Sequence, residues 1–116
     1  MPVRSTELPL TARQKNMEKK HQLVDNENAK RFQFELDNGD IAKIEYIKAK
    51  EKIYLTHTEV PVGYEGQGIG SELIKQTLEH IKEQDWTLIP LCPFVAKYLQ
   101  KHPEWKVLVM KGINIE

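Results

Sequence analysis

The sequence predicts a single α/β domain in which a mixed, mostly antiparallel sheet carries two main helices in the order β-β-β-α-β-α. Three observations support this fold class. Apolar residues alternate on both sides of an Asn-Gly pair, which is typical of a β-hairpin. A strand, a glycine-rich turn and a helical pattern then follow one another. A short apolar run completes a β-α-β crossover, and such crossovers are right-handed in nearly all parallel units.

The N-terminal segment is polar and has only scattered apolar positions. Because such a segment offers little surface to bury, we expect residues 1–28 to form a mostly flexible arm and residues 29–116 to form the domain. The chain has 116 residues, of which 40% are hydrophobic, so it can build one modest core.

The expected sheet begins with a hairpin at "RFQFELDNGDIAKIEYI", residues 31–47. Alternation within each strand places one set of apolar side chains on a common face. This set is Phe32, Phe34, Leu36, Ala42, Ile44 and Tyr46. The segment "KIYLTHTEV", residues 52–60, is rich in β-branched and aromatic residues and predicts a third strand.

Two helices and one buried strand are expected in the second half. Apolar residues recur at helical spacing from Ile69 to Ile81, and the side chains expected to face solvent are Glu72, Lys75, Gln76, Glu79 and Lys82. The run "WTLIPL", residues 86–91, is typical of a strand buried on both faces. Residues 93–102 predict a second helix, with Pro93 in its first turn and Pro103 after its end. The remaining tail is interpreted as a last strand or a packed segment.

Charge and composition exclude several classes of function. Seventeen basic and seventeen acidic side chains balance, so no global field attracts the chain to nucleic acid or to a membrane surface. No apolar stretch is long enough to span a bilayer, and the N-terminus lacks the apolar core of a secretory signal. We therefore expect a cytoplasmic protein. The single cysteine excludes an internal disulfide and a multi-cysteine zinc site, and we expect no metal.

Three of the six glycines, Gly66, Gly68 and Gly70, stand where the first helix is expected to begin. A strand, a glycine turn and a helix N-terminus form an arrangement that binds phosphate, because bare backbone and unpaired N–H groups can approach the anion. The spacing differs from both the P-loop and the dinucleotide fingerprint. The alternative is a helix start that merely needs a tight turn. Because Gly costs about 1 kcal/mol relative to Ala inside a helix, three glycines are hard to explain in that way.

The glycine segment resembles that of the GNAT acetyltransferases, which carry [QR]-x-x-G-x-[GA] between a central strand and the helix that binds the CoA pyrophosphate. Gly68 and Gly70 occupy the two small positions, whereas Glu65 stands where the motif has Gln or Arg. "HTEVP", "GQGIGSELI", "PLCPFVAKYLQKHPEW" and the hairpin are together similar to the short, single-domain GNAT-like proteins. The similarity covers roughly residues 28–105.

The resemblance implies a minimal GNAT-like fold, with acetyl-CoA (coenzyme A) as co-substrate and an unidentified amine, small or on a protein or peptide, as acceptor. The alternative is a non-catalytic CoA-binding or interaction domain, because the segments that shape the acceptor pocket in larger GNAT enzymes are not apparent. We expect a monomer or weak homodimer. The residues expected to bind the cofactor are Val60, Val62, Glu65, Gly66, Gln67, Gly68, Ile69, Gly70 and Ser71.

His57 and Cys92 are the expected catalytic residues. Cys92 lies between a strand and a helix, where ligands gather in open sheets and where the helix dipole favours a thiolate. His57 lies near the end of the third strand, on the face predicted for Ile53 and Leu55. The resemblance implies that the two strands splay apart around the thioester. We therefore expect both side chains to point into one cleft.

Two mechanisms are compatible with this pair. In direct transfer, His57 takes a proton from the acceptor amine, which attacks the thioester. In a ping-pong route, His57 activates Cys92, which carries the acetyl group. Glu59 is an alternative base. Tyr98 is expected to pack, and the other interpretation is that it donates a proton to the leaving thiolate. Cys92 can also be interpreted as a small buried hydrophobe, and His57 as a polar strand residue without a catalytic role.

Overall fold

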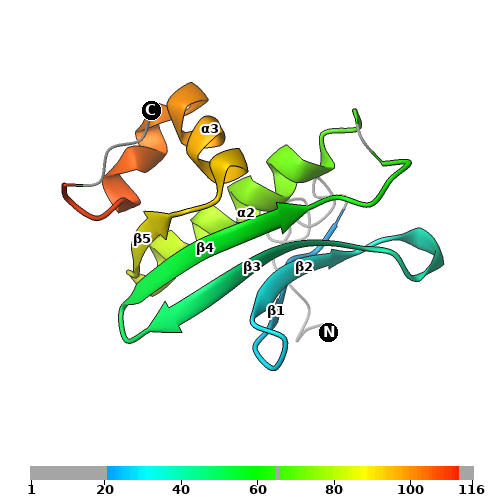
Figure 1. Ribbon diagram of the computed structural model, residues 1–116, viewed down its shortest axis with the longest axis horizontal. Helices are drawn as coiled ribbons and strands as arrows, with labels where there is room; N and C mark the ends of the chain where they lie inside the picture. The colour runs from blue at the N-terminus through cyan, green and yellow to red at the C-terminus, as the bar shows by residue number, and fades with distance from the viewer. Residues whose placement is uncertain (1–20, 65, 113–116) are drawn as a thin grey trace, which may run out of the picture.

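The structure, a computed structural model, describes residues 21–64 and 66–112. Its described part forms a five-stranded sheet in the order β1-β2-β3-β4-β5, with two α-helices (Figure 1). The elements are β1 (Val24–Asn26), β2 (Arg31–Glu35), β3 (Ile41–Ala49), β4 (Lys52–Glu59), α2 (Ile69–Gln84), β5 (Thr87–Pro90) and α3 (Pro93–Lys101), with 3-10 helices at Asp37–Gly39 and Pro103–Leu108. The predicted α/β class and mixed sheet are confirmed.

Strands β1 to β4 form an antiparallel meander, because short turns join each strand to the next. In the β2–β3 hairpin, Phe32 pairs with Ile44 and Phe34 pairs with Ala42, and all four side chains are fully buried. The turn places Gly39 at φ +80, a left-handed backbone that glycine adopts without steric cost. The alternating pattern around Asn-Gly therefore predicted this hairpin correctly.

The crossover from β4 through α2 to β5 makes the last strand pair parallel. Ile53 pairs with Leu88 and Tyr54 pairs with Ile89. Successive residues of a strand point to opposite faces, yet Leu88 is fully buried and Ile89 is only 4% exposed. The prediction that this strand is buried on both faces is confirmed.

Helix α2 covers one face of the sheet (Figure 1), and its apolar stripe packs against the apolar side chains of β2 to β5. Gln76 was expected to face solvent, but it is 5% exposed. Its Nε2 donates to the carbonyl oxygen of His21 at 3.0 Å and to Oε2 of Glu72 at 2.7 Å. Burial of this amide is compatible with its polarity because both contacts satisfy it. Gln76 thus ties the segment before β1 to the helix.

Both ends of the described chain differ from the expected organisation. The sheet begins at Val24, before the expected boundary at residue 28, and residues 1–20 of the expected arm lie outside the described residues. At the other end, residues 103–108 form a 3-10 helix, and Val109 makes an isolated parallel bridge with Leu88. The tail is therefore a packed segment, and not a full strand, over the part that the structure describes.

A β-bulge interrupts β4 at Thr56. Tyr46 of β3 pairs with Leu55, but Glu45 pairs with His57, so Thr56 has no partner in the ladder. The hydroxyl of Thr56 instead donates to the carbonyl oxygen of Glu45 at 3.2 Å. An extra residue of this kind shifts the alternation of side chains along the strand beyond it.

The bulge reverses which face of the sheet each side chain occupies at the end of β4. Thr58 pairs with the buried Ile44 and so lies on the core face, whereas His57 lies on the opposite face. The expectation that His57 shares a face with Ile53 and Leu55 is therefore wrong. Period-two alternation holds only in an uninterrupted strand, and this strand carries one extra residue.

Candidate functional site

The loop after β4 ends at Gly68, which caps the N-terminus of α2. Gly66 and Gly68 have φ values of +82 and +79, in the left-handed region that side chains with a Cβ enter at a steric cost. The first intrahelical bond runs from the N–H of Glu72 to the carbonyl oxygen of Gly68 at 3.0 Å. The N–H groups before Glu72 have no acceptor within the helix. This helix end can therefore donate several hydrogen bonds to an anion.

A cavity of about 310 Å³ opens at this helix end. It is lined by six of the residues expected to bind the cofactor, Val60, Gly66, Gly68, Ile69, Gly70 and Ser71, together with Tyr64 and Phe94. Of the other three, Val62 is 90% exposed, Gln67 is exposed beside the loop, and Glu65 lies outside the described residues. Most of the expected set is thus brought together around one space.

The two helix-proximal glycines are required for different reasons. A Cβ on Gly68 would meet no atom within 4 Å, so its requirement is the left-handed backbone. A Cβ on Gly70 would lie 3.0 Å from Cζ of Phe94 and 3.5 Å from Cγ2 of Val60. Gly70 therefore allows the aromatic ring at the start of α3 to approach α2 closely. The sequence-based interpretation gave both glycines a phosphate role, and this contact adds a packing role for Gly70.

Two aromatic residues at the cavity escaped the sequence analysis. Phe94 is 48% exposed although it is large and apolar, and Tyr64 lies in the loop, where its hydroxyl donates to the carbonyl oxygen of Asp37 at 3.2 Å. Burial and the carboxylates of Asp40 and Asp37 raise the pKa of the Tyr64 phenol, which therefore stays protonated at neutral pH. An aromatic residue between glycines, and another directly after the Cys-Pro pair, are the signals that could have identified them.

Cys92 lies at the N-terminus of α3, as expected, and is 3% exposed. Its backbone N–H donates to the carbonyl oxygen of Leu55 at 2.9 Å, which fixes the start of the helix against β4. Its Sγ lies 3.2 Å from Oγ1 of Thr58, and either atom can be the donor. The β4 side chain that contacts the thiol of Cys92 is thus that of Thr58, on the core face.

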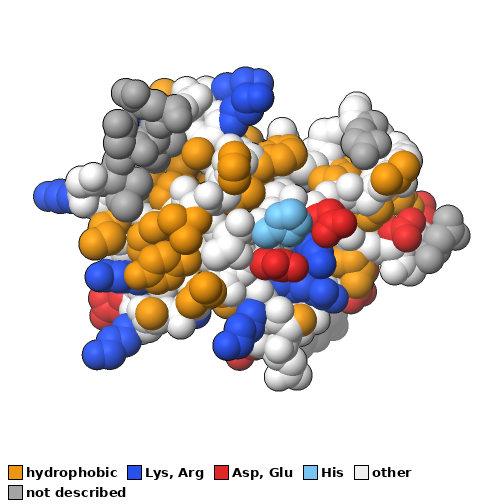
Figure 2. All heavy atoms as spheres, in the orientation of Figure 1, with side chains coloured by type: hydrophobic (Ala, Val, Ile, Leu, Met, Phe, Trp, Pro, Cys, Tyr) orange, Lys and Arg blue, Asp and Glu red, His pale blue; other side chains and the backbone are white. Residues whose placement is uncertain are grey.

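His57 belongs to a charged cluster on the outer face of the sheet. Its Nε2 lies 3.7 Å from Oε1 of Glu59, and Lys43 contacts both Glu59 at 3.7 Å and Glu45 at 3.2 Å. Figure 2 shows a histidine flanked by acidic side chains on this face. The His57 side chain is 56% exposed. The expectation that His57 and Cys92 point into one cleft is not met, because the bulge turns them to different faces.

Tyr98, the alternative proton donor, lies on α3, where its ring packs against His102 with centroids 4.2 Å apart. Burial raises the pKa of its phenol, and the carboxylates of Glu104, Glu72 and Glu79 add to this effect. The Tyr98 hydroxyl is therefore a neutral donor at physiological pH. An ordinary phenol is also neutral at this pH, so the raised pKa makes Tyr98 a weaker acid without changing its protonation state.

Within residues 21–64 and 66–112, no group of three or more His, Cys, Asp or Glu residues is arranged to hold a metal ion. The helices of the same segments include none with the length and apolarity needed to cross a bilayer.

Comparison with known proteins identifies a family to which most of the described chain is similar. The family model described as "GCN5-related N-acetyl-transferase" matches residues 31–108, which include the sheet from β2 onward, the glycine loop and both helices. The chain is also similar to Protein NATD1 of Homo sapiens and of Mus musculus, each 37% identical over 59 residues. This match covers 51% of the chain, and it spans about half of each relative, 51% of the human and 53% of the mouse protein.

A solved structure extends the similarity over most of the chain. The solution structure of a GCN5-like protein from Staphylococcus aureus superimposes with a TM-score of 0.61 at 26% sequence identity. The superposition covers 80% of this chain and 90% of the other. The family match, the shared fold and the glycine loop point to one conclusion: the chain belongs to the GCN5-related N-acetyltransferase family.

Proposed function

We propose that this protein binds acetyl-CoA at the N-terminus of α2 and transfers its acetyl group to an amine. One observation carries the proposal. Gly66 and Gly68 hold the loop in a left-handed backbone, so the open first turn of α2 borders a cavity of about 310 Å³. Backbone N–H groups of residues 68–71 would donate to the pyrophosphate, and Phe94 and Val60 would contact the apolar part of the cofactor.

In the transfer step, the acceptor nitrogen attacks the thioester carbonyl, the carbon–sulfur bond breaks, and the CoA thiolate leaves and takes up a proton. The amine loses a proton to a base. His57 is the proposed base, with Glu59 as its neighbour, because both side chains are more than half exposed and an acceptor can reach them from solvent. Tyr98 is the proposed proton donor to the leaving thiolate.

The environment of Cys92 favours direct transfer over an acetylated enzyme. Attack by the sulfur needs both access to the thioester and a base, but Sγ is in a 3% exposed residue and its polar contact is the hydroxyl of Thr58. A hydroxyl is too weak a base to generate a thiolate at neutral pH. We therefore propose a positioning role for Cys92 at the junction of β4 and α3.

Thermal unfolding with added ligand tests the cofactor assignment. Acetyl-CoA and CoA at about 100 times their dissociation constants should stabilise the folded state by about 2.7 kcal/mol, and NAD and ATP should not. Equal stabilisation by ATP would reduce the site to a general phosphate site. Release of the CoA thiol on addition of small amines, or of a peptide with a free N-terminus and lysines, then tests transfer.

A non-catalytic CoA-binding domain is the second candidate, and one observation favours it. The cavity contains neither His57, which lies on the outer face, nor an exposed thiol. This candidate predicts stabilisation by acetyl-CoA without thiol release for any amine. Loss of thiol release in His57→Ala, with acetyl-CoA binding unchanged, would decide in favour of the enzyme.

A further inference from the structure

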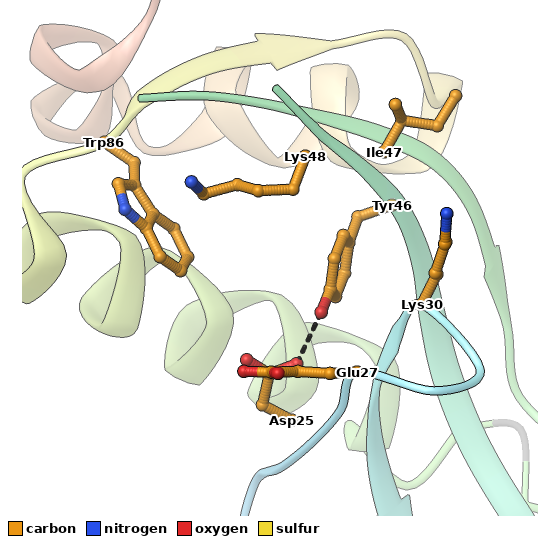
Figure 3. Close-up of a pocket in the computed structure, with 7 residues that line it drawn as sticks. All are labelled: Asp25, Glu27, Lys30, Tyr46, Ile47, Lys48 and Trp86. Atoms are coloured by element: carbon orange, nitrogen blue, oxygen red, sulfur yellow. Dashed lines mark hydrogen bonds between the residues drawn. The ribbon is translucent and has the colours of Figure 1, made fainter. Parts of the chain in front are cut away.

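A second cavity, of about 330 Å³, lies at the other end of β4, next to the turn between β3 and β4 (Figure 3). Lys48, in the wall of this cavity, pairs with Ile53 of β4. The proposed base His57 lies four residues, or about 13 Å, further along that strand. A ligand here is therefore remote from the proposed site of transfer. We propose that this cavity binds an alkylammonium group, carried by a lysine side chain or by a small amine.

The protein's own Lys48 shows that the wall accepts such a group. Its ammonium lies 4.3 Å from the centroid of the Trp86 ring, in a cation–π contact, and it also donates to the carbonyl oxygen of Lys50. A lysine side chain is an alkylammonium ion on a flexible stem. An external ammonium can take the same place over Trp86 once Lys48 swings into solvent, which its exposed position permits.

Two carboxylates form the opposite side of the cavity. In Figure 3, the carboxylates of Asp25 and Glu27, which both line the cavity, lie on the side away from Lys48. Asp25 accepts a hydrogen bond from the Tyr46 hydroxyl at 2.6 Å. Glu27 has no side-chain hydrogen bond or ion pair with the residues that the structure describes. Its charge is thus available to a cationic guest.

A chain of aromatic contacts fixes the walls before any ligand arrives. The Tyr46 ring packs on Phe32 with centroids 4.7 Å apart, Phe32 meets His80 edge-on at 5.5 Å, and His80 meets Trp86 edge-on at 5.4 Å. Phe32 is fully buried, so this chain is anchored in the core. A wall that is already in place loses little entropy on binding.

The other cation at the rim does not occupy the space between the carboxylates and the indole. Lys30 lies in the turn before β2, and in Figure 3 its side chain extends away from the two carboxylates. The backbone of this turn is held by the hydrogen bond from the N–H of Tyr46 to the carbonyl oxygen of Lys30 at 2.9 Å. The two carboxylates and the indole face therefore surround a space that suits one positive charge with a short apolar stem.

Fluorescence of Trp86 tests the proposal directly. In a Trp105→Phe background, Trp86 is the one remaining tryptophan, and titration with n-butylammonium chloride should change its emission in a saturable way. Butanol, the neutral analogue, and butyrate, the anionic one, should have no saturable effect at the same concentrations. If butanol changes the emission as much as n-butylammonium does, the cavity binds apolar groups without regard to charge. If butyrate binds more tightly than n-butylammonium, Lys30 and Lys48 make the cavity an anion site. Either result overturns the proposal.

Three substitutions make the test specific. Lys48→Met keeps the apolar stem but removes the internal competitor, so it should tighten binding of n-butylammonium several-fold. Glu27→Gln should weaken binding about threefold, as expected for a partly exposed charge pair. Glu104→Gln removes a matched charge outside the cavity and should change nothing. Unchanged affinity in both Lys48→Met and Glu27→Gln would refute the assignment.

Two further measurements separate this site from the cofactor site and identify the source of the ammonium. Acetyl-CoA should stabilise the Glu27→Gln protein as much as the unchanged protein, so failure of one proposal does not imply failure of the other. Nα-acetyl-lysine methylamide should bind as well as n-butylammonium if the natural ligand is a lysine side chain of a partner. Binding of n-butylammonium alone would indicate a small amine.

Discussion

The hydroxyl of Thr58 and the thiol of Cys92 lie 3.2 Å apart and join the end of β4 to the start of α3. The bulge at Thr56 creates this contact, because it turns Thr58 to the core face and His57 to the outer face. The thiol of the chain's single cysteine is therefore buried between β4 and α3.

Incubation with acetyl-CoA in the absence of an acceptor should leave Cys92 unmodified, because its sulfur is buried and lacks a base. Intact-mass spectrometry measures this. An added acetyl group that hydroxylamine removes would establish the ping-pong route instead. Alkylation in the native state should be much slower than in urea, and Cys92→Ala should retain transfer activity.

Gly68→Ala should abolish or strongly weaken CoA binding, because it disturbs the backbone that presents the first turn of α2. Gly39→Ala is a matched control, since Gly39 has φ +80 against +79 at Gly68 and both positions have open space for a Cβ. Both substitutions should cost about 1–2 kcal/mol of stability. Calorimetric titration with CoA should show weakened binding for Gly68→Ala but not for Gly39→Ala. Equal affinities of the two variants for CoA would show that the backbone at Gly68 is not needed to bind the pyrophosphate.

Gly70→Val should destabilise the protein by about 1–3 kcal/mol, because its side chain would overlap Phe94 and Val60. Removal of the ring in Gly70→Val/Phe94→Ala should restore part of this loss. Urea unfolding of both single variants and the double variant gives the coupling energy. A coupling near zero would mean that Gly70 does not serve the packing of α3 on α2.

Glu65→Arg should tighten CoA binding in a salt-dependent way, because Arg is one of the residues that the family motif carries at this position and exposed charges are screened. Titration at low and high salt measures this change. Glu65→Gln, which removes the charge without adding a cation, should give an intermediate affinity. Identical affinities for all three proteins would indicate that this side chain does not face the pyrophosphate.

The hydrogen bond from Tyr46 to Asp25 should make stability fall at high pH. Burial, the hydrogen bond to Asp25 and the nearby acids raise the pKa of the Tyr46 phenol above its ordinary value of 10. The stabilisation is complete below the unfolded-state pKa and is lost above it, because only the unfolded chain ionises there. The stability difference between the unchanged protein and Tyr46→Phe should therefore be about 1–2 kcal/mol at pH 8 and shrink above pH 10. A constant difference up to pH 11 would contradict this assignment.

The parts of the fold that the sequence predicted are those with strong local patterns. Phe32, Phe34, Ala42 and Ile44 alternate around a turn, and this pattern alone specifies the hairpin and its buried face. By contrast, nothing in "YLTHTEV" indicates the extra residue at Thr56, because a bulge depends on how two strands align. The predicted partnership of His57 and Cys92 was wrong for that reason.

Most of the candidate site was predictable because glycine spacing reflects backbone requirements. Gly66 and Gly68 indeed adopt left-handed conformations at the start of α2. The role of Phe94 was not predictable, since it arises from the approach of α3 to Gly70 across the tertiary fold. Burial of Gln76 was missed for a similar reason, because its hydrogen-bond partner is the backbone of His21.

β4 has an antiparallel neighbour, β3, on one side and a parallel neighbour, β5, on the other, and the two pairings enclose very different lengths of chain. The β2–β3–β4 meander needs only short loops to close, whereas the β4–β5 pair must close the whole segment 60–86, which costs more chain entropy. The cavity at α2 is lined by Val60, which directly follows β4, and by Phe94, which lies beyond β5 in α3. A molecule bound there should therefore protect β5 and α3 from hydrogen exchange more strongly than it protects the meander.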